Sequence, residues 1–361
     1  MHIPDGYLSP STCAVLYVGA GLGWYGALRR IRRTLTTRMV PLISVFAAFS
    51  FVLMMFNLPL PGGTTGHALG VTIAVIVIGP AGSIMAISIA IAIQALFFGD
   101  GGITTLGANC VNMAIVGSLV AYVAYRMISS GAAITSRRRL IAAAAAGYLA
   151  TNAAAFIAAV EFGIQPLLFR NAGGVPLYAP YSLGVAIPAM MIGHLAIAGV
   201  AEGAIATGLV AFLQGADPAL LHSTSGLAPD SSAAYSSTSL RSLRKLWISV
   251  ALLLLLTPLG VLTAGKAWGE WHASEYSTAA GRARIAASSQ NQPAPSETPT
   301  GLQRLSSLWT APIADYAPQI VKSPALGYLL SGMFGVGLVM SLCFAMQSLL
   351  LRRRGGPGQA A

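Results

Sequence analysis

Residues 66–98 read GHALGVTIAVIVIGPAGSIMAISIAIAIQALFF, and they decide the fold of this chain. The run is almost wholly apolar and far longer than the roughly 20 residues that one transmembrane helix needs. Gly79-Pro80-Ala81-Gly82 interrupts it near the middle. Proline removes a helical hydrogen bond and the flanking glycines weaken the helix further. The run is therefore either one very long helix or two helices that reverse at this tetrapeptide.

The composition places the chain among integral membrane proteins. Of its 361 residues, 55% are hydrophobic and 9% are charged, and the mean hydropathy is +0.71. A soluble domain carries about a quarter charged residues. The formal net charge is +11, but the basic residues form short clusters between apolar runs. Such clusters are typical of cytoplasmic loops, so nucleic-acid binding is excluded as the function and membrane lipid is the expected surrounding.

The positions of the basic clusters decide between one helix and two in the opening run. Other apolar runs lie near 11–28, 39–58, 107–128, 140–161, 182–212, 246–264 and 325–351. The basic clusters are Arg29–Arg33, Arg137–Arg139, Arg241–Lys245 and Arg352–Arg354. With the N-terminus outside, all four clusters fall inside only if 66–98 crosses twice. We therefore predict an all-α integral membrane protein with a seven-helix unit and two additional transmembrane helices.

This topology divides the chain into four parts. Residues 1–213 form a membrane domain and 214–245 a cytoplasmic linker rich in Ser, Ala and Pro. Residues 246–351 form a two-helix module with an external segment at 266–324, and 352–361 form a cytoplasmic tail. The first apolar run is followed, not preceded, by basic residues, which argues against a cleaved signal peptide. We expect an inner or plasma membrane protein with its N-terminus outside and its C-terminus in the cytoplasm.

The first two residues and His67 form a candidate metal site on the outer face. The Met1 amine, the His2 amide and the His2 imidazole can wrap one divalent ion, and His67 would add a fourth nitrogen. Histidine is bulky, so the initiator Met1 should be retained. A square plane of nitrogens favours Ni(II) or Cu(II), whereas Zn(II) prefers a tetrahedron. Taken alone, His67 is more readily an interfacial histidine than a ligand; its place on the same face as His2 favours the ligand role.

The external loop after Phe98 is unusually rich in hydrogen-bonding side chains. Irregular polar backbone near membrane depth persists only where it is buried in protein or lines a cavity. A metal-bound histidine donates its other ring nitrogen to an oxygen partner. The loop is either an exposed hairpin or a structured lid beside the metal, and the density of polar groups favours the lid. The candidate residues are Asp100, Thr104, Thr105, Asn109 and Asn112.

Two ionisable residues, His194 and Glu202, lie within the predicted seventh helix. Such residues inside a span are costly and are usually paired or functional. Their spacing puts them about two helical turns apart on neighbouring faces, so a direct pair is not assured. A structural polar network is favoured over a relay or a contact with a partner helix.

Two enzyme motifs are missing from the sequence. It holds no G-x-x-x-x-G-K-[ST] phosphate loop and no H-E-x-x-H metalloprotease motif. The three cysteines have the spacing of neither a disulfide framework nor a thiolate metal site. The missing motifs argue against ATP hydrolysis by a phosphate loop and against a zincin-type protease, so active uptake would need a separate energy source.

Several stretches resemble the CbiM/NikM family, the substrate-binding S components of cobalt and nickel energy-coupling-factor (ECF) transporters. The first is the opening MHIPDGYLSP, although Pro4-Asp5 stand where many relatives have Met-Glu. The others are Gly101–Asn109 with Asn112-Met113, and Gly193–Leu195 through Glu202. Trp268–Trp271 and Ala311–Pro318 resemble, more loosely, the small two-helix N component, here fused to the S component.

This resemblance implies a ligand set, a fold and partners. The family binds metal through the N-terminal amine, the residue-2 amide and imidazole, and a second histidine, which here are Met1, His2 and His67. The implied fold is a compact seven-helix unit whose N-terminal loop enters the interior. The implied partners are an energy-coupling transmembrane subunit and ATP-binding-cassette ATPase subunits. Such fusions are more frequent in nickel systems, which favours nickel by analogy.

We therefore expect Ni(II) to be captured outside and delivered across the membrane by an ATP-driven complex. Binding should weaken at acidic pH, because the ligand nitrogens must lose protons. Co(II), as a substrate for cobalamin synthesis, is the main alternative. An intramembrane enzyme that uses His194 and Glu202 would be active alone and would survive substitution of His2. An energy-independent metal channel would take up metal without an ATPase.

Overall fold

The computed structural model describes residues 1–34, 39–225, 240–262 and 266–352, and this part of the chain is mainly helical. The first unit contains α1 (Pro10–Thr34), α2 (Met39–Met54), β1 (Leu58–Leu60), β2 (Thr64–Gly66), α3 (Val71–Ile93), η1 (Gln94–Phe98), α4 (Leu106–Asn109), η2 (Cys110–Val116), α5 (Gly117–Ser129), α6 (Arg137–Leu168), α7 (Leu183–Gly193), η3 (His194–Ala198), α8 (Gly199–Ala216) and η4 (Pro218–Leu221). The second unit contains α9 (Leu240–Leu256), η5 (Thr257–Leu262), α10 (Ala273–Tyr276), α11 (Ala279–Ser288), α12 (Thr300–Leu305), η6 (Ala314–Tyr316) and α13 (Pro324–Arg352).

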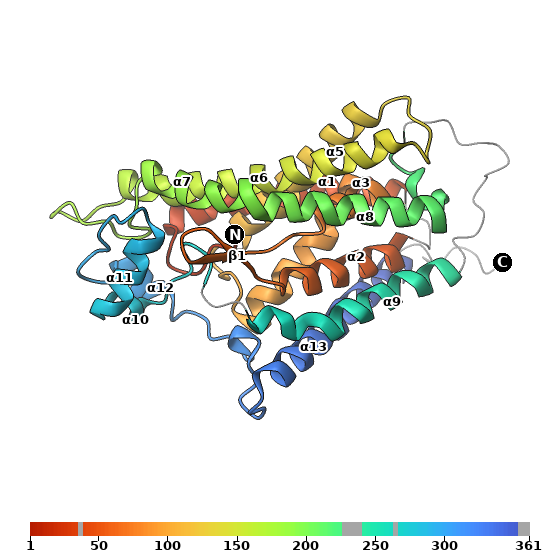
Figure 1. The fold of residues 1–361 in the computed structure, drawn as a ribbon. Coiled ribbons are helices and arrows are strands. Elements are labelled where there is room, and N and C mark those ends of the chain that lie inside the picture. Colours follow the sequence, from red (N-terminus) through yellow and green to blue (C-terminus); the bar gives the residue numbers. More distant parts are fainter. Residues whose placement is uncertain (35–38, 226–239, 263–265, 353–361) are drawn as a thin grey trace.

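The helices pack as a bundle with one polar cap. Helix α6 packs along α5, α7 and α8, whereas α3 packs against α1, α2 and α5. Helices α9 and α13 of the second unit lie against α2 (Figure 1). The short helices α10, α11 and α12 gather at one end of the molecule, beside α7 (Figure 1). The N-terminus lies in the middle of the bundle (Figure 1).

Small residues let the long helices approach closely. A Cβ atom on Gly147 of α6 would lie 3.0 Å from the backbone of Gly203 in α8. A Cβ atom on Gly203 would in turn lie 2.7 Å from the Ala144 carbonyl oxygen. Close backbone contact of this kind is how helices associate where lipid removes the hydrophobic driving force. It fixes α8, and with it Glu202, against the rest of the bundle.

Helix α3 breaks at the predicted tetrapeptide. Gly79 has φ 73° and ψ 170°, which is not helical, and the chain is helical on either side of it. The Ser83 hydroxyl donates to the Val71 carbonyl over 3.4 Å, so the second segment runs back beside the first. Glycine allows this reversal because an L side chain rarely adopts a positive φ. The prediction of a break with reversal is confirmed.

The first of the two segments is shorter than predicted. It begins at Val71 instead of residue 66 and ends at Ile78. At a rise of 1.5 Å per residue, this segment is about 12 Å long. A helix of that length cannot cross a hydrocarbon core of about 30 Å. The antiparallel β1–β2 hairpin and the irregular residues 67–70 precede it. The position of His67 follows from this arrangement, since it lies in the irregular stretch and not at the start of a long helix.

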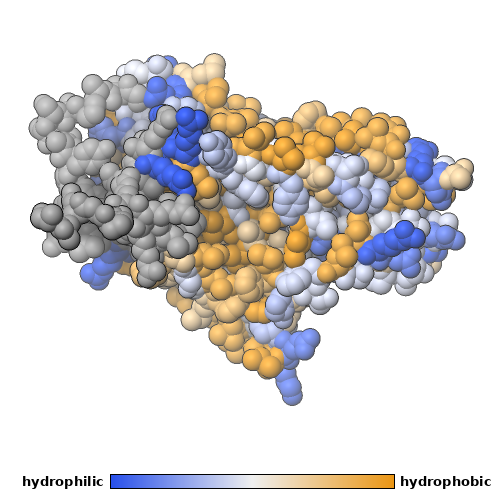
Figure 2. All heavy atoms as spheres, turned by 180° about the vertical axis from the view of Figure 1, so that it is seen from behind, coloured by the Kyte–Doolittle hydropathy of each residue, from blue (hydrophilic) through white to orange (hydrophobic). Residues whose placement is uncertain are grey.

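By length and composition, five helical stretches of the described residues could cross a membrane, the first of them counted across the break at Gly79; this fits the predicted all-α membrane fold. They are Val71–Phe98, Leu106–Ser129, Arg137–Leu168, Leu183–Ala216 and Pro324–Ala345. Val40–Met54 and Leu246–Leu262 are shorter apolar helices. Apolar side chains dominate the middle of the face in Figure 2, and hydrophilic side chains gather toward its ends. The chain is thus an all-α membrane protein.

The end of the first unit is anchored by two arginines. Arg126 donates to the Thr224 carbonyl over 3.1 Å, and the buried Arg139 donates to the Ser225 carbonyl over 3.2 Å. The first part of the predicted linker 214–245 is therefore packed on the bundle. Residues 226–239 of that linker lie outside the described residues, as do 353–361 of the predicted tail 352–361. The basic clusters at 241–245 and 352–354 fall largely among residues whose side chains are also not described.

Candidate metal centre

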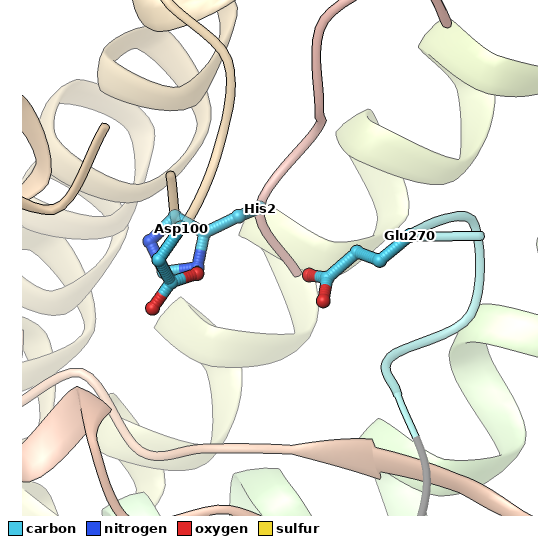
Figure 3. Close-up of side chains that lie close together, drawn as sticks. All are labelled: His2, Asp100 and Glu270. Carbon is cyan, nitrogen blue, oxygen red and sulfur yellow. The ribbon is translucent and has the colours of Figure 1, made fainter. Parts of the chain in front are cut away.

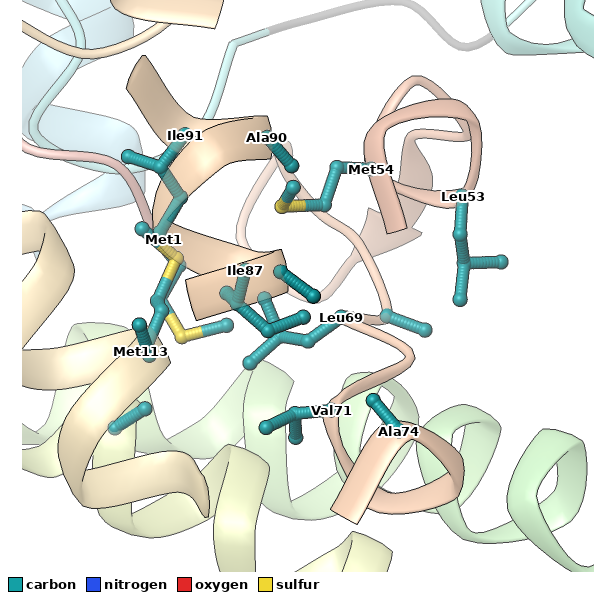
Figure 4. Close-up of a cluster of buried hydrophobic side chains, with 14 of the residues drawn as sticks. Met1, Leu53, Met54, Leu69, Val71, Ala74, Ile87, Ala90, Ile91 and Met113 are labelled. Carbon is teal, nitrogen blue, oxygen red and sulfur yellow. The ribbon is translucent and has the colours of Figure 1, made fainter. Parts of the chain in front are cut away.

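The N-terminal segment is threaded into the bundle. Met1 and His2 are 2% and 1% exposed, and Ile3 is fully buried. The Met1 side chain lies in an apolar cluster with Ile87, Ile91 and Met113 (Figure 4). Burial of the first side chain fixes the position of the amine that precedes it. The chain therefore presents its own N-terminus inside the protein, as the resemblance implied.

Backbone hydrogen bonds to Ile3 hold this segment in place. The Ile3 amide donates to Asn109 Oδ1 over 2.8 Å, and its carbonyl accepts from Asn109 Nδ2 over 3.1 Å. The same carbonyl accepts from the Gly102 amide over 2.9 Å and from the Thr105 hydroxyl. Asn109 thus clamps both polar groups of one residue. The predicted lid residues Thr105 and Asn109 lie next to the N-terminal segment.

Asp5 fixes the other side of the same loop. Its carboxylate accepts from the Ile103 amide over 3.1 Å and from the Thr104 amide over 2.7 Å. The Thr104 hydroxyl also donates to Asp5 over 2.5 Å. In the sequence, Asp5 stands out only as a departure from the common motif. In the structure it joins the N-terminal segment to loop 99–105.

Substitution of Gly102 by alanine should separate these two segments. The added Cβ would lie 2.4 Å from the Asp5 amide nitrogen, far inside van der Waals contact. We expect Gly102→Ala to lower Ni(II) affinity by about 10-fold or more, as loss of the groups that support a metal site does. Calorimetry on the purified protein measures this. Gly173→Ala, in an exposed loop with 3.4 Å of clearance, is the matched control; equal affinities of the two variants would contradict the prediction.

His2 and His67 face each other inside the protein. His2 Nδ1 lies 3.3 Å from His67 Nε2, and the ring centroids are 4.9 Å apart. His67 is 4% exposed. Its Nδ1 lies 3.2 Å from the Ala68 carbonyl, which can only accept a hydrogen bond. This contact places the proton on Nδ1 and turns the lone pair of Nε2 toward His2.

The surroundings of His67 favour the neutral form of its imidazole. Burial lowers the pKa of the His67 imidazole well below its usual value, and the neighbouring His2 and N-terminal ammonium lower it further. A neutral imidazole with a free lone pair is the form that ligates a metal.

Asp100 lies on the outer side of His2. Its Oδ1 is 3.0 Å from His2 Nδ1. Its Oδ2 accepts from the Tyr316 hydroxyl over 2.7 Å and from Gln94 Nε2 over 3.3 Å. Burial raises the pKa of the Asp100 carboxyl, but His2, His67 and the Tyr316 hydroxyl together lower it, so it lies well below its ordinary value. Asp100 is therefore an oriented carboxylate next to the predicted ligand.

Glu270 reaches the site from the second unit (Figure 3). Its Oε1 lies 3.7 Å from the Met1 amine. Ligand atoms of His2, Asp100 and Glu270 all lie within 4.8 Å of one another. Burial raises the pKa of the Glu270 carboxyl, and the ammonium opposes that shift. Sequence analysis missed Glu270, although it lies in the stretch Trp268–Trp271 that resembled the N component.

Glu202 supports the His67 loop from behind. One carboxylate oxygen accepts from the Leu69 and Gly70 amides over 2.8 Å each, and the other accepts from the Thr72 amide over 3.2 Å. These amides lie at the start of the short first segment of α3, where helical N–H groups lack partners within the helix. The negative carboxylate also interacts favourably with the positive end of the helix dipole. The geometry fits the structural role favoured from the sequence.

Removal of the Glu202 carboxylate should destabilise the protein. Glu202→Ala leaves three buried amides without an acceptor, and hydrogen bonds to a charged group are worth about 2 kcal/mol each. We expect the midpoint of thermal unfolding in detergent to fall by several degrees and Ni(II) affinity to fall with it. Glu297→Ala, at an exposed carboxylate, is the control. An unchanged midpoint for Glu202→Ala would contradict this role.

Among the described contacts, His194 and Asn112 pair with groups other than the two histidines. His194 Nδ1 contacts the Met190 carbonyl of its own helix over 2.7 Å, and its Nε2 has no hydrogen-bond partner among the described residues. Asn112 donates to Glu161 over 2.7 Å. Among the described contacts, none joins His194 to Glu202 or Asn112 to His2. Asn112 therefore pairs with Glu161, and its role as a lid residue stays a prediction.

Segment 266–324 of the second unit covers the site. The Tyr7 hydroxyl donates to the Trp271 carbonyl over 2.8 Å, and the Thr65 amide donates to the Lys266 carbonyl over 3.3 Å. The Tyr316 ring stacks on Phe98 with centroids 4.6 Å apart. These contacts tie segment 266–324 to the N-terminal segment, the β1–β2 hairpin and η1.

Two family profiles match the chain. The profile CbiM, described as cobalt uptake substrate-specific transmembrane region, matches residues 2–220. The profile PDGLE domain matches residues 244–352. Together they include both units of the structure.

Relatives match along nearly the whole chain. The fused nickel transport protein NikMN of Rhodobacter capsulatus is 52% identical over 94% of this chain and 95% of its own length. The probable fused nickel transport protein LarMN of Lactiplantibacillus plantarum is 35% identical over 96% of this chain and 98% of its own length. A crystal structure of a transition metal transporter superposes with a TM-score of 0.57 and 45% identity, over 60% of this chain and 94% of that one.

Proposed function

Because this chain belongs to the CbiM family of cobalt uptake transmembrane regions, with a PDGLE domain fused behind it, we propose that it captures Ni(II) outside the cell and passes it across the membrane. Like its relatives, it is a metal transport protein and not an enzyme. One observation carries the proposal. His2 Nδ1 and His67 Nε2 lie 3.3 Å apart, buried, beside the protein's own N-terminal amine.

The proposed ligands are the Met1 amine, the His2 amide and imidazole, and the His67 imidazole. Metal–nitrogen bonds of about 2.0 Å put adjacent ligands of a square plane about 2.8 Å apart. The 3.3 Å between the two imidazole nitrogens is close to this spacing. A cation that replaces the hydrogen between them needs only a small movement of the rings.

Nickel is the favoured cargo and cobalt the alternative. Four nitrogens in a plane suit Ni(II), whereas site geometry and supply decide between Ni(II) and Co(II) in the cell. Two fused relatives that match nearly the whole chain are named as a nickel transport protein and a probable nickel transport protein. The family profile is named for cobalt. Co(II) for cobalamin synthesis would predict tighter Co(II) than Ni(II) binding in the purified protein.

Energy for uptake would come from other subunits. The sequence holds no phosphate-binding loop. The proposed complex therefore includes an energy-coupling transmembrane subunit and ABC-type ATPases. The N-terminus would face outside and the C-terminus the cytoplasm, with domains at 1–213 and 246–351 joined by 214–245. Glu270 and Tyr316 support a role for the external segment 266–324 in closing the site.

Uptake of radioactive nickel tests this function. Cells that express the chain with its coupling subunits should accumulate nickel, and His67→Ala should abolish accumulation above background. Cells that lack the ATPases should not accumulate nickel. Nickel uptake that persists without ATPases would favour the channel alternative, and uptake that survives His67→Ala would place the site elsewhere.

A further inference from the structure

The polar groups around His2 differ sharply in their access to solvent. The carboxylates of Asp100 and Glu270 are 21% and 23% exposed. The two imidazoles, by contrast, are almost fully buried. The carboxylates therefore form a rim that a cation from outside meets before it reaches the nitrogens.

The rim has the geometry of a cation site of its own. Asp100, Glu270 and His2 offer two carboxylate oxygens and one imidazole nitrogen within 4.8 Å of one another (Figure 3). Oxygen atoms on opposite sides of a bound ion lie about 4–5 Å apart. The set holds only one nitrogen of the proposed plane, so it differs from that plane in chemistry.

The contacts of each rim residue leave a ligand atom facing this space. Tyr316 and Gln94 hold Asp100 Oδ2, which leaves Oδ1 turned to His2. Glu270 lies 3.7 Å from the Met1 amine, beyond hydrogen-bond length. His2 is buried, and its Nδ1 lies 3.0 Å from Asp100 Oδ1 and 3.3 Å from His67 Nε2. This nitrogen therefore faces both the carboxylates of the rim and the second imidazole.

We propose that Asp100, Glu270 and His2 Nδ1 form a rim site, a weak oxygen-rich cation site through which the metal passes to the nitrogen plane. This inference rests on the proposed function and adds a step to it. The hydrated ion exchanges water for the carboxylates while His2 is already a ligand. The Met1 amine, the His2 amide and His67 then replace the two carboxylates, and the amine and amide protons leave to solvent.

Charge and ligand type give the two sites different tasks. Carboxylates at a partly exposed rim concentrate cations, which can raise association rates by 10-fold or more. Oxygen ligands bind first-row ions less tightly than imidazole and amine nitrogens do. The rim site therefore fills fast and empties fast, and the buried plane holds the ion.

Manganese is the probe that separates the rim site from the nitrogen plane, because Mn(II) prefers oxygen ligands. We expect full-length His67→Ala, which lacks a ligand of the plane, to bind one Mn(II) in electron paramagnetic resonance titrations. The triple variant with Asp100→Asn and Glu270→Gln should lose this binding. Equal Mn(II) binding by the two variants, or none by His67→Ala, would overturn the proposal.

The rate of Ni(II) association gives a second test that leaves the plane intact. In stopped-flow measurements, Glu270→Gln should bind Ni(II) about 10-fold more slowly than wild type. Glu297→Gln, an exposed carboxylate of the same segment, should match wild type. A wild-type rate for Glu270→Gln would contradict the rim site. A failure of the proposed function gives a different result from a failure of the rim site. In that case His67→Ala would retain wild-type Ni(II) binding.

Discussion

Insertion of one glutamine between Met1 and His2 is expected to abolish the tight 1:1 complex with Ni(II). The insertion separates the amine from the imidazole by an extra residue, so the compact three-nitrogen chelate cannot form. It also moves the amine relative to the apolar cluster that holds Met1. We expect a loss of more than about 100-fold in affinity, above the 10–100-fold typical of supporting residues. Calorimetry with purified protein measures it.

Two features make this insertion specific. Glutamine is bulky enough that the initiator methionine stays in place, whereas an inserted alanine would allow its removal and restore a histidine at position 2. All side chains of the native protein are kept. His2→Ala and His67→Ala should show the same loss. If the insertion variant binds Ni(II) as wild type does, the amine is not a ligand, and His194, with its unpaired Nε2, becomes the next candidate.

Substitution of Asn109 by alanine is expected to cause the second largest loss. Asn109 is the single side chain that pairs with both the amide and the carbonyl of Ile3. Without it the N-terminal segment loses two buried hydrogen bonds, and the ammonium and His2 are held less firmly. Loss of a residue that orients ligands costs 10–100-fold in metal affinity, and we expect a loss of this size for Asn109→Ala.

Asn112→Ala provides the comparison. Asn112 lies in the next turn but pairs with Glu161 and not with the N-terminal segment. We expect the Ni(II) affinity of the folded Asn112→Ala protein to match wild type, even if its thermal stability falls. Equal losses of affinity in the two variants would mean that helix α4–η2 as a whole, and not the Asn109 clamp, supports the site.

The sequence allowed the membrane fold to be predicted, because the signals are local. The apolar runs and the break at Gly79-Pro80 can be recognised within a few residues. The short first segment of α3 could not be predicted in the same way. Its start at Val71 depends on Glu202, which caps it from a helix more than 100 residues away. Capping by a distant side chain leaves no local pattern.

The site was predictable only in part, for the same reason. His2 and His67 could be paired because each stood beside a marked feature, the chain start and a glycine-rich loop. Glu270 and Tyr316 could not be placed there, since nothing near either residue indicates that it folds back onto the first unit. Asn109 and Asn112 look alike in sequence. Only the folded structure shows that Asn109 binds the backbone of Ile3, whereas Asn112 binds Glu161.

X-ray absorption of the Ni(II)-loaded protein tests the central claim most directly. We expect four nitrogen ligands at a short distance and the pre-edge feature of a square-planar ion, both changed in His67→Ala. A six-coordinate spectrum dominated by oxygen, unchanged in His67→Ala, would contradict the nitrogen chelate built on Met1, His2 and His67.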